Sequence, residues 1–235
     1  WPPSPYCRVD DRYPEDYLRK NIDERCKNLD TDCIDLLQLH TWTRAWNDTP
    51  RPFDVLKQLQ AEGKISKIGI STPEQDQNAV IDLIRQGYID TVQLIYNIFE
   101  QEPAAQLLDV ALEYNVGVIV RVPFDEGSLT GKFSEQSVFP KDDFRHIYFS
   151  GERLRKTVEH VNDLKIDIEP TGWQLPALAL KFPLMHPAVS TVIPGMRKEC
   201  QAEANTNVSD LGDPDDSVME ICRKHAWRRG VWYSK

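Results

Sequence analysis

The sequence predicts an α/β fold in which helices cover a parallel sheet, and three observations support this prediction. Short apolar runs alternate with longer stretches whose apolar residues recur at helical spacing, a pattern typical of β–α units. None of the 11 glycines forms a Gly-x-Gly-x-x-Gly turn, which a doubly wound nucleotide-binding sheet would usually carry. Polar side chains follow several predicted strands, so the sequence favours a (β/α)8 TIM barrel over the doubly wound alternative.

The chain up to residue 123 alternates helices and strands. Its helical segments have apolar residues three or four positions apart, as expected of helices with one buried face. These segments are 14–29 with Leu18, Ile22 and Leu29, 53–63 with Phe53, Leu56 and Leu59, 73–86 with Val80, Leu83 and Ile84, and 103–115 with Leu107, Leu108, Ala111 and Leu112. The apolar runs between them predict buried strands at 33–40, 67–71, 91–96 and 116–123.

The remaining chain begins with a polar, irregular stretch over 125–150, which is the best candidate for a long functional loop. Helices are expected near 151–165 and 173–186, a last strand at 189–193, and polar helices near 197–207 and 214–227. Residues 1–235 are expected to form a single domain.

Composition excludes several classes of protein. The net charge is −9, from 28 basic and 37 acidic residues, so a general nucleic-acid binder is not expected. No apolar run approaches the roughly 18 residues of a membrane helix, and no membrane partner is expected. The five cysteines are odd in number and lack Cys-x-x-Cys spacing, which indicates buried thiols in a reducing, cytoplasmic setting.

His40 closes the first apolar strand. An imidazole at that position could polarise a carbonyl group or relay a proton. The alternative is a core histidine that is hydrogen-bonded to the backbone. The other four histidines show no metal-ligand spacing, and no metal site is predicted.

Two segments after the last strands are candidate anion sites. Residues 127–132 superficially resemble a phosphate-binding P-loop but have three residues between the glycines instead of four. Such a loop can still bind a pyrophosphate through backbone N–H groups, and the alternative is a flexible loop. Residues 193–197 end the last strand and open a helix, where N–H groups and Arg197 could bind phosphate instead of forming an ordinary cap.

Small polar residues lie at or near the ends of two other predicted strands. Ser71, Thr72 and Gln93 offer the donors and acceptors that an amide ligand needs. The alternative is that Thr72 caps a helix before Pro73 and that Gln93 is a buried residue bonded to backbone. Trp42, close after His40, could line a substrate pocket or simply pack in a loop.

Taken together, these motifs resemble the aldo-keto reductase family from about residue 14 to residue 207. Five segments carry the resemblance, in the family's order and at its spacings. They are 31–40, 62–71, 92–97, 123–132, and 192–195 followed by Gln201 and Asn205.

The resemblance implies a barrel that binds a nicotinamide cofactor, usually NADP with NAD possible, and transfers hydride between it and an aldehyde or ketone substrate. By this resemblance, His40 is the catalytic histidine that orients the carbonyl. Ser71 and Gln93 hold the carboxamide, with Thr72 where the family often has Asn. Phe124, Gly127, Leu129 and Lys132 match the pyrophosphate loop, whereas Gly195, Met196, Arg197, Gln201 and Asn205 match the adenosine end. Arg197 favours a 2′-phosphate.

Two departures from the family pattern matter. Arg121 stands where the family commonly stacks an aromatic ring on the nicotinamide, although a planar guanidinium can also stack. The family's catalytic Asp, Tyr and Lys come from its first three strands, whereas the first predicted strand here matches the fourth. We therefore expect the chain to supply roughly strands 4 to 8, to need a preceding segment of the same protein, and to be inactive alone. The alternative is a non-catalytic NADP-binding regulatory or partner-binding subunit on the same fold.

Overall fold

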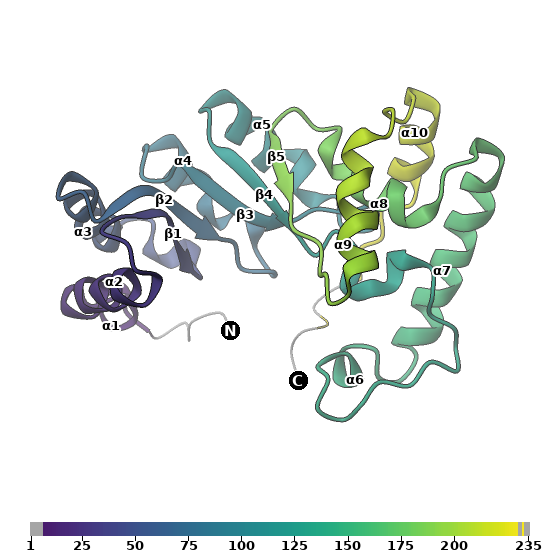
Figure 1. Ribbon diagram of the computed structural model, residues 1–235, viewed down its shortest axis with the longest axis horizontal. Helices are drawn as coiled ribbons and strands as arrows, with labels where there is room; N and C mark the ends of the chain where they lie inside the picture. Colours follow the sequence, from purple (N-terminus) through teal and green to yellow (C-terminus); the bar gives the residue numbers. More distant parts are fainter. Residues whose placement is uncertain (1–6, 230–231, 233–235) are drawn as a thin grey trace. The chain divides into compact units, whose positions relative to one another are not determined.

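The computed structural model describes residues 7–229 and 232 (Figure 1). The chain divides into two compact units. The first holds the chain up to Leu94 together with Ala104–Ile119, and the second holds Ile95–Pro103 and the chain from Val120. The prediction that residues 1–235 form a single domain stays a prediction.

The described residues contain one five-stranded parallel sheet, as predicted. Its strands are β1 (Ile34–His40), β2 (Ile65–Ser71), β3 (Thr91–Ile95), β4 (Gly117–Arg121) and β5 (Val189–Val192). They lie in the order of the sequence, β1-β2-β3-β4-β5. This order is that of successive β–α units. That these are the fourth to eighth strands of a barrel stays a prediction.

Both units contain helices, and α1 and α2 precede the first strand. The first unit contains α1 (Val9–Arg12), α2 (Glu15–Leu29), α3 (Arg51–Ala61), α4 (Ile81–Arg85) and α5 (Leu107–Glu113). The second contains α6 (Arg145–Tyr148), α7 (Arg153–Ile168), α8 (Leu175–Leu184), α9 (Glu199–Thr206) and α10 (Asp216–Lys224). In the described part of the chain, no helix combines the length and the apolar character that crossing a membrane requires.

Several predicted boundaries and core positions are wrong. The helix expected at 73–86 begins as a 3-10 turn at Gln77 and continues as the short α4. Leu29 is 65% exposed and Leu112 48% exposed, because each lies near a helix end, where the chain turns away from the core. Helix α2 instead buries Cys26 beside the predicted Leu18 and Ile22.

Other sequence expectations hold in part. The stretch 125–150 is not wholly irregular, because it contains a 3-10 helix over Asp125–Thr130 and the short α6. Strand β1 is less buried than predicted, since most of its side chains keep some exposure. Of the five free cysteines, Cys26 and Cys222 are buried, whereas Cys200 is exposed.

Candidate functional site

Three candidate residues of the first unit lie in one row across the sheet. His40 pairs with Ser71 in the register of β1 and β2, and Ser71 pairs with Gln93 in that of β2 and β3. Neighbouring strands lie about 4.8 Å apart, and paired residues of a parallel sheet point to the same face. The sequence argument that polar strand ends converge is therefore met by the register of these three strands.

The backbone around His40 is fixed from two sides. The next residue, Thr41, is buried, and its Oγ1 donates a hydrogen bond of 2.9 Å to the carbonyl of Ser71. The carbonyl of Thr41 accepts a bond of 2.7 Å from the hydroxyl of Tyr13. Burial raises the pKa of Tyr13 to about 12, so this hydroxyl keeps its proton at neutral pH. His40 itself is exposed, which argues against a core histidine.

Thr72 does not cap the turn that follows it. Its side chain is fully buried, and its Oγ1 donates to the Oε1 of Gln77 at 3.2 Å. Its backbone N–H donates to the carbonyl of Gln93 at 2.9 Å. The following 3-10 turn has Asp76 at its N-cap. The alternative in which Thr72 caps a helix is not met, because four residues separate it from the turn. Its role in holding the cofactor stays a prediction.

Gln93 and Gly69 shape the same face. The Nε2 of Gln93 lies 3.5 Å from the Oε1 of Gln38, a long and weak hydrogen bond. This amide is half-buried and can turn toward a ligand at low cost. Gly69 lies on β2, two residues before Ser71. A Cβ atom on Gly69 would lie 2.3 Å from the Oγ1 of Thr91. A side chain there would displace the strand beside it.

Trp42 packs in the core and does not line a solvent-open pocket. It is 0% exposed. Its ring centroid lies 5.2 Å from that of Trp46 and 5.1 Å from that of Phe53. Its Nε1 donates to the Oδ1 of Asn47 at 2.8 Å. Of the two alternatives for Trp42, the structure shows packing, because the loop after β1 folds inward under α3.

In the second unit, the predicted pyrophosphate loop is a tight coil. Gly127 has a φ of +100°, which only glycine adopts readily, and Gly131 has a φ of +71°. The N–H groups of Gly127 and Leu129 donate to the carbonyl of Phe124 at 2.9 and 3.0 Å. Leu129 is fully buried, whereas Lys132 is exposed. The N–H groups of Gly127 and Leu129 are thus already used within the loop. Among the residues predicted to bind the pyrophosphate, Lys132 presents a charge to solvent.

Sequence reasoning missed a second cation beside this loop. The Nη1 of Arg145 would lie 3.9 Å from a Cβ atom on Gly127. Arg145 is held by Asp143, whose Oδ1 accepts from the Nε of Arg145 at 3.0 Å. The hydrogen bonds from Arg145, assisted by the charge of Arg197, lower the pKa of Asp143 to about 2. Asp143 thus holds Arg145 beside Gly127, and the polar composition of 125–150 was the signal available for this cation.

The predicted adenosine end is an exposed turn leading into α9. Gly195, Met196 and Arg197 are exposed. The Oε1 of Gln201 accepts from the N–H groups of Arg197 and Lys198 at 2.8 and 3.1 Å, which pins the turn to the helix. The Nδ2 of Asn205 is buried and finds no hydrogen-bond partner among the residues that the structure describes. A buried donor without a partner is costly unless a ligand supplies the acceptor.

Comparison with known proteins decides the family. The profile described as "Aldo/keto reductase family" matches residues 8–226, most of the chain. The chain belongs to the aldo/keto reductase family. This confirms the resemblance drawn from the five segments.

Curated aldo/keto reductases show the same relationship. The chain is 30% identical over 198 residues to the aldo-keto reductase YhdN of Bacillus subtilis, covering 81% of this chain and 57% of that protein. It is 27% identical over 213 residues to the Schizosaccharomyces pombe aldo-keto reductase yakc [NADP(+)], covering 88% of this chain and 61% of that protein. The chain thus spans about three fifths of the length of these relatives.

A solved aldo-keto reductase shares the fold. The AKR11C1 structure from Bacillus halodurans, in its holo form, superimposes with a TM-score of 0.73 at 24% identity. The match covers 92% of this chain and 67% of that one. Aldo-keto reductase structures belong to the TIM-barrel class of folds, which the sequence predicted. The roles of the individual site residues stay predictions.

Proposed function

We propose that this aldo/keto reductase reduces aldehydes or ketones by hydride transfer from NADPH. The row formed by His40, Ser71 and Gln93 carries the proposal. The cofactor supplies the hydride when it is bound. The exposed imidazole of His40 can orient a substrate carbonyl, while Ser71 and Gln93 offer a hydroxyl and an amide to the carboxamide of the cofactor.

The residues of the second unit fit a dinucleotide phosphate. Arg145 lies against Gly127 of the tight loop, Lys132 is exposed after it, and Arg197 is exposed at the start of α9. Arginine is suited to a 2′-phosphate because its guanidinium offers paired donors. The buried Nδ2 of Asn205 can donate a hydrogen bond to an acceptor on adenine. Arg121, half-buried at the end of β4, is proposed to stack on the nicotinamide ring.

The preference for NADP is a proposal about this chain, because its relatives differ. The Escherichia coli NADH-specific methylglyoxal reductase is 24% identical over 212 residues, covering 86% of this chain and 63% of that protein. The name of the Schizosaccharomyces pombe relative specifies NADP(+). The exposed Arg197 favours NADP over NAD. The need for a preceding segment that carries Asp, Tyr and Lys, and the inactivity of the isolated chain, stay predictions.

The reductase activity is tested with the full-length protein and NADPH. We expect oxidation of NADPH with a set of short and aromatic aldehydes, followed at 340 nm. His40→Ala is expected to lower kcat/KM by roughly 100-fold, within the range of acid–base and orienting groups. Unchanged turnover in His40→Ala would remove this residue from the reaction. Binding of NADPH without any turnover would favour the non-catalytic alternative.

The coenzyme preference is tested by Arg197→Ala. Loss of a charge-assisted contact costs about 1.5–3 kcal/mol, so NADPH binding is expected to weaken roughly tenfold to a hundredfold. NADH binding is expected to change less than about twofold, because NADH lacks the 2′-phosphate. Titration of both coenzymes by protein fluorescence measures this, with Lys224→Ala as a matched surface control. Equal losses for the two coenzymes would contradict the assignment.

A further inference from the structure

The chain after α10 packs against other parts of the second unit, to which it belongs. The N–H of Trp227 donates to the carbonyl of Phe99 at 2.8 Å. The Trp227 ring stacks on His160, with centroids 3.9 Å apart and an interplanar angle of 25°. The guanidinium of Arg229 lies 5.1 Å from the Trp227 ring and 5.4 Å from the Trp232 ring. This segment therefore places a cation in an aromatic setting.

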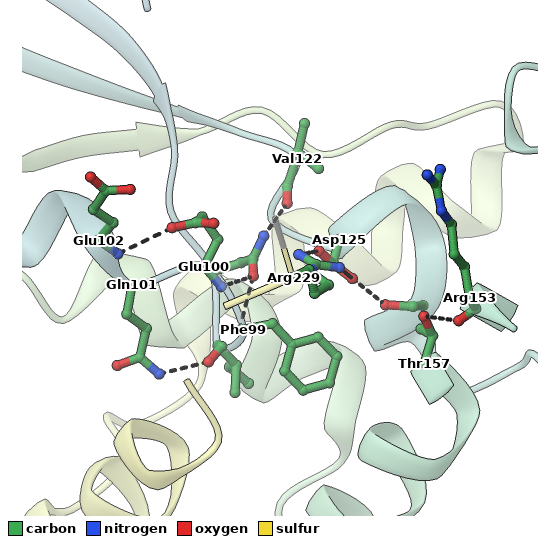
Figure 2. Close-up of polar contacts among 12 residues, drawn as sticks. Phe99, Glu100, Gln101, Glu102, Val122, Asp125, Arg153, Thr157 and Arg229 are labelled. Carbon is green, nitrogen blue, oxygen red and sulfur yellow. Dashed lines mark hydrogen bonds and ion pairs between the residues drawn. The ribbon is translucent and has the colours of Figure 1, made fainter. Parts of the chain in front are cut away.

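Arg229 forms a two-pronged ion pair with Asp125 (Figure 2). The Nη1 of Arg229 donates to the Oδ2 of Asp125 at 2.7 Å, and its Nη2 donates to Oδ1. The side chains are 8% and 2% exposed. Burial alone would lower the pKa of Arg229, but the charge and hydrogen bonds of Asp125 raise it, so the guanidinium stays charged. The same carboxylate accepts from the Oγ of Ser128 at 2.7 Å.

Asp125 belongs to the tight loop that is proposed to bind the pyrophosphate, and Asp125 and Glu126 both have a left-handed φ, of 49° and 57°. The far end of the loop is held by Lys165 of α7, whose Nζ donates to the carbonyl of Gly131 at 2.7 Å. Two buried or half-buried cations thus tie down the loop at both ends. Neither cation is among the residues assigned to the cofactor above.

The negative charge of Asp125 would oppose the binding of a phosphate if Arg229 did not compensate it. A buried carboxylate within a phosphate-binding loop repels an incoming anion, because the repulsion is poorly screened away from water. The paired guanidinium cancels this charge and fixes the left-handed backbone of the loop at the same time. Removing one partner of a buried pair leaves the other charge uncompensated, which is more damaging than removing both.

We propose that Arg229 is a positioning residue that, by pairing with Asp125, holds the 123–131 loop closed and neutralises the charge of Asp125 for the pyrophosphate of a dinucleotide. The assignment of a ligand to this loop rests on the proposed function. The ion pair and its hold on the loop do not.

The test compares Arg229→Met, Asp125→Asn and the double variant in the full-length protein at pH 8. NADP⁺ contains the pyrophosphate, whereas adenosine 2′-monophosphate does not. Arg229→Met is expected to weaken NADP⁺ binding at least roughly tenfold while binding of adenosine 2′-monophosphate stays within about twofold. The double variant should regain most of the lost NADP⁺ affinity, because no unpaired charge remains. Arg155→Met, in an exposed ion-pair cluster of α7, is the matched control and should leave both ligands unaffected.

The pH dependence separates a charge effect from a general structural effect. A buried carboxyl group without a cationic partner favours its neutral form. Other titratable groups close to the pair are Glu100, whose pKa burial raises, Tyr148, and His160, whose pKa burial lowers. The double variant keeps all three, so their titration is common to both variants. Relative to the unmodified protein at the same pH, Arg229→Met should recover NADP⁺ affinity between pH 8 and pH 5.5, as Asp125 takes up a proton. The double variant should show no recovery, and a parallel recovery in both would overturn the proposal.

Hydrogen exchange of residues 123–131 in the ligand-free protein distinguishes this inference from the proposed function. Faster exchange in Arg229→Met, with slower exchange regained in the double variant, supports the hold of the ion pair on the loop, even if the unmodified protein binds no NADP⁺. Equal exchange in all variants overturns it. If Arg229→Met does not fold, Arg229→Lys keeps the charge but loses the two-pronged geometry. Exchange in Arg229→Lys that matches the unmodified protein would then refute a geometric role.

Discussion

Replacing Trp42 by alanine is expected to destabilise the protein by about 3–5 kcal/mol, as for other buried tryptophans. Its indole is 0% exposed and touches three aromatic neighbours, with Tyr13 stacked at a centroid distance of 6.5 Å beside Trp46 and Phe53. Truncation opens a large cavity and removes the donor that Asn47 accepts from. Urea unfolding followed by circular dichroism measures the loss.

Trp42→Phe is the matched control, because it keeps an aromatic ring in the cluster and removes only the indole N–H and part of the volume. We expect it to cost less than half as much as Trp42→Ala. The KM for aldehydes should stay unchanged in Trp42→Phe if the side chain has only a packing role. A loss below about 1 kcal/mol in Trp42→Ala would contradict the packing seen here.

The sheet and the first-unit site could be predicted because both follow from local pattern. Alternation of apolar runs and helical stripes locates the strands within a few residues. The carboxyl ends of parallel strands share one edge, so His40, Ser71 and Gln93 were expected to lie together, and the register places them in one row. Leu29 and Leu112 were misplaced because periodicity does not show where a helix end leaves the core.

The rest of the candidate site depends on contacts that no local pattern reveals. Asp125 and Arg229 lie 104 residues apart in the sequence, and their pairing arises from the fold alone. The glycines of 127–131 indicated a loop that could bind an anion through its backbone, but not that the N–H groups of Gly127 and Leu129 are used inside it. A glycine-rich sequence shows which backbone angles are accessible, whereas the partners of each N–H depend on the whole loop.

Asn97→Ala is expected to destabilise the second unit by about 3 kcal/mol or more. Asn97 is 0% exposed. Its Nδ2 donates to the carbonyl of Val122 at 3.0 Å, and its Oδ1 accepts from the N–H groups of Phe99 and Glu100 at 3.0 and 2.9 Å. Alanine leaves three backbone groups without this partner, and each unsatisfied buried group costs about 1–3 kcal/mol. Differential scanning calorimetry should show a Tm lower by roughly 6–12 °C, with the exposed Asn207→Ala as control.

Asn97→Asp separates the two halves of this network. An ionised Asp keeps the acceptor for Phe99 and Glu100 but faces the Val122 carbonyl with a second oxygen, so its folded-state pKa is expected to be raised. A raised pKa means that the folded state holds the proton more tightly, and stability should fall as pH rises through the range above the unfolded-state pKa. Asn97→Asp should therefore be more stable at pH 5 than at pH 8, relative to the unmodified protein. Because Val122 follows Arg121 directly, the ionised variant should also lose coenzyme affinity, and a pH-independent Tm difference would show that the Val122 carbonyl does not depend on this donor.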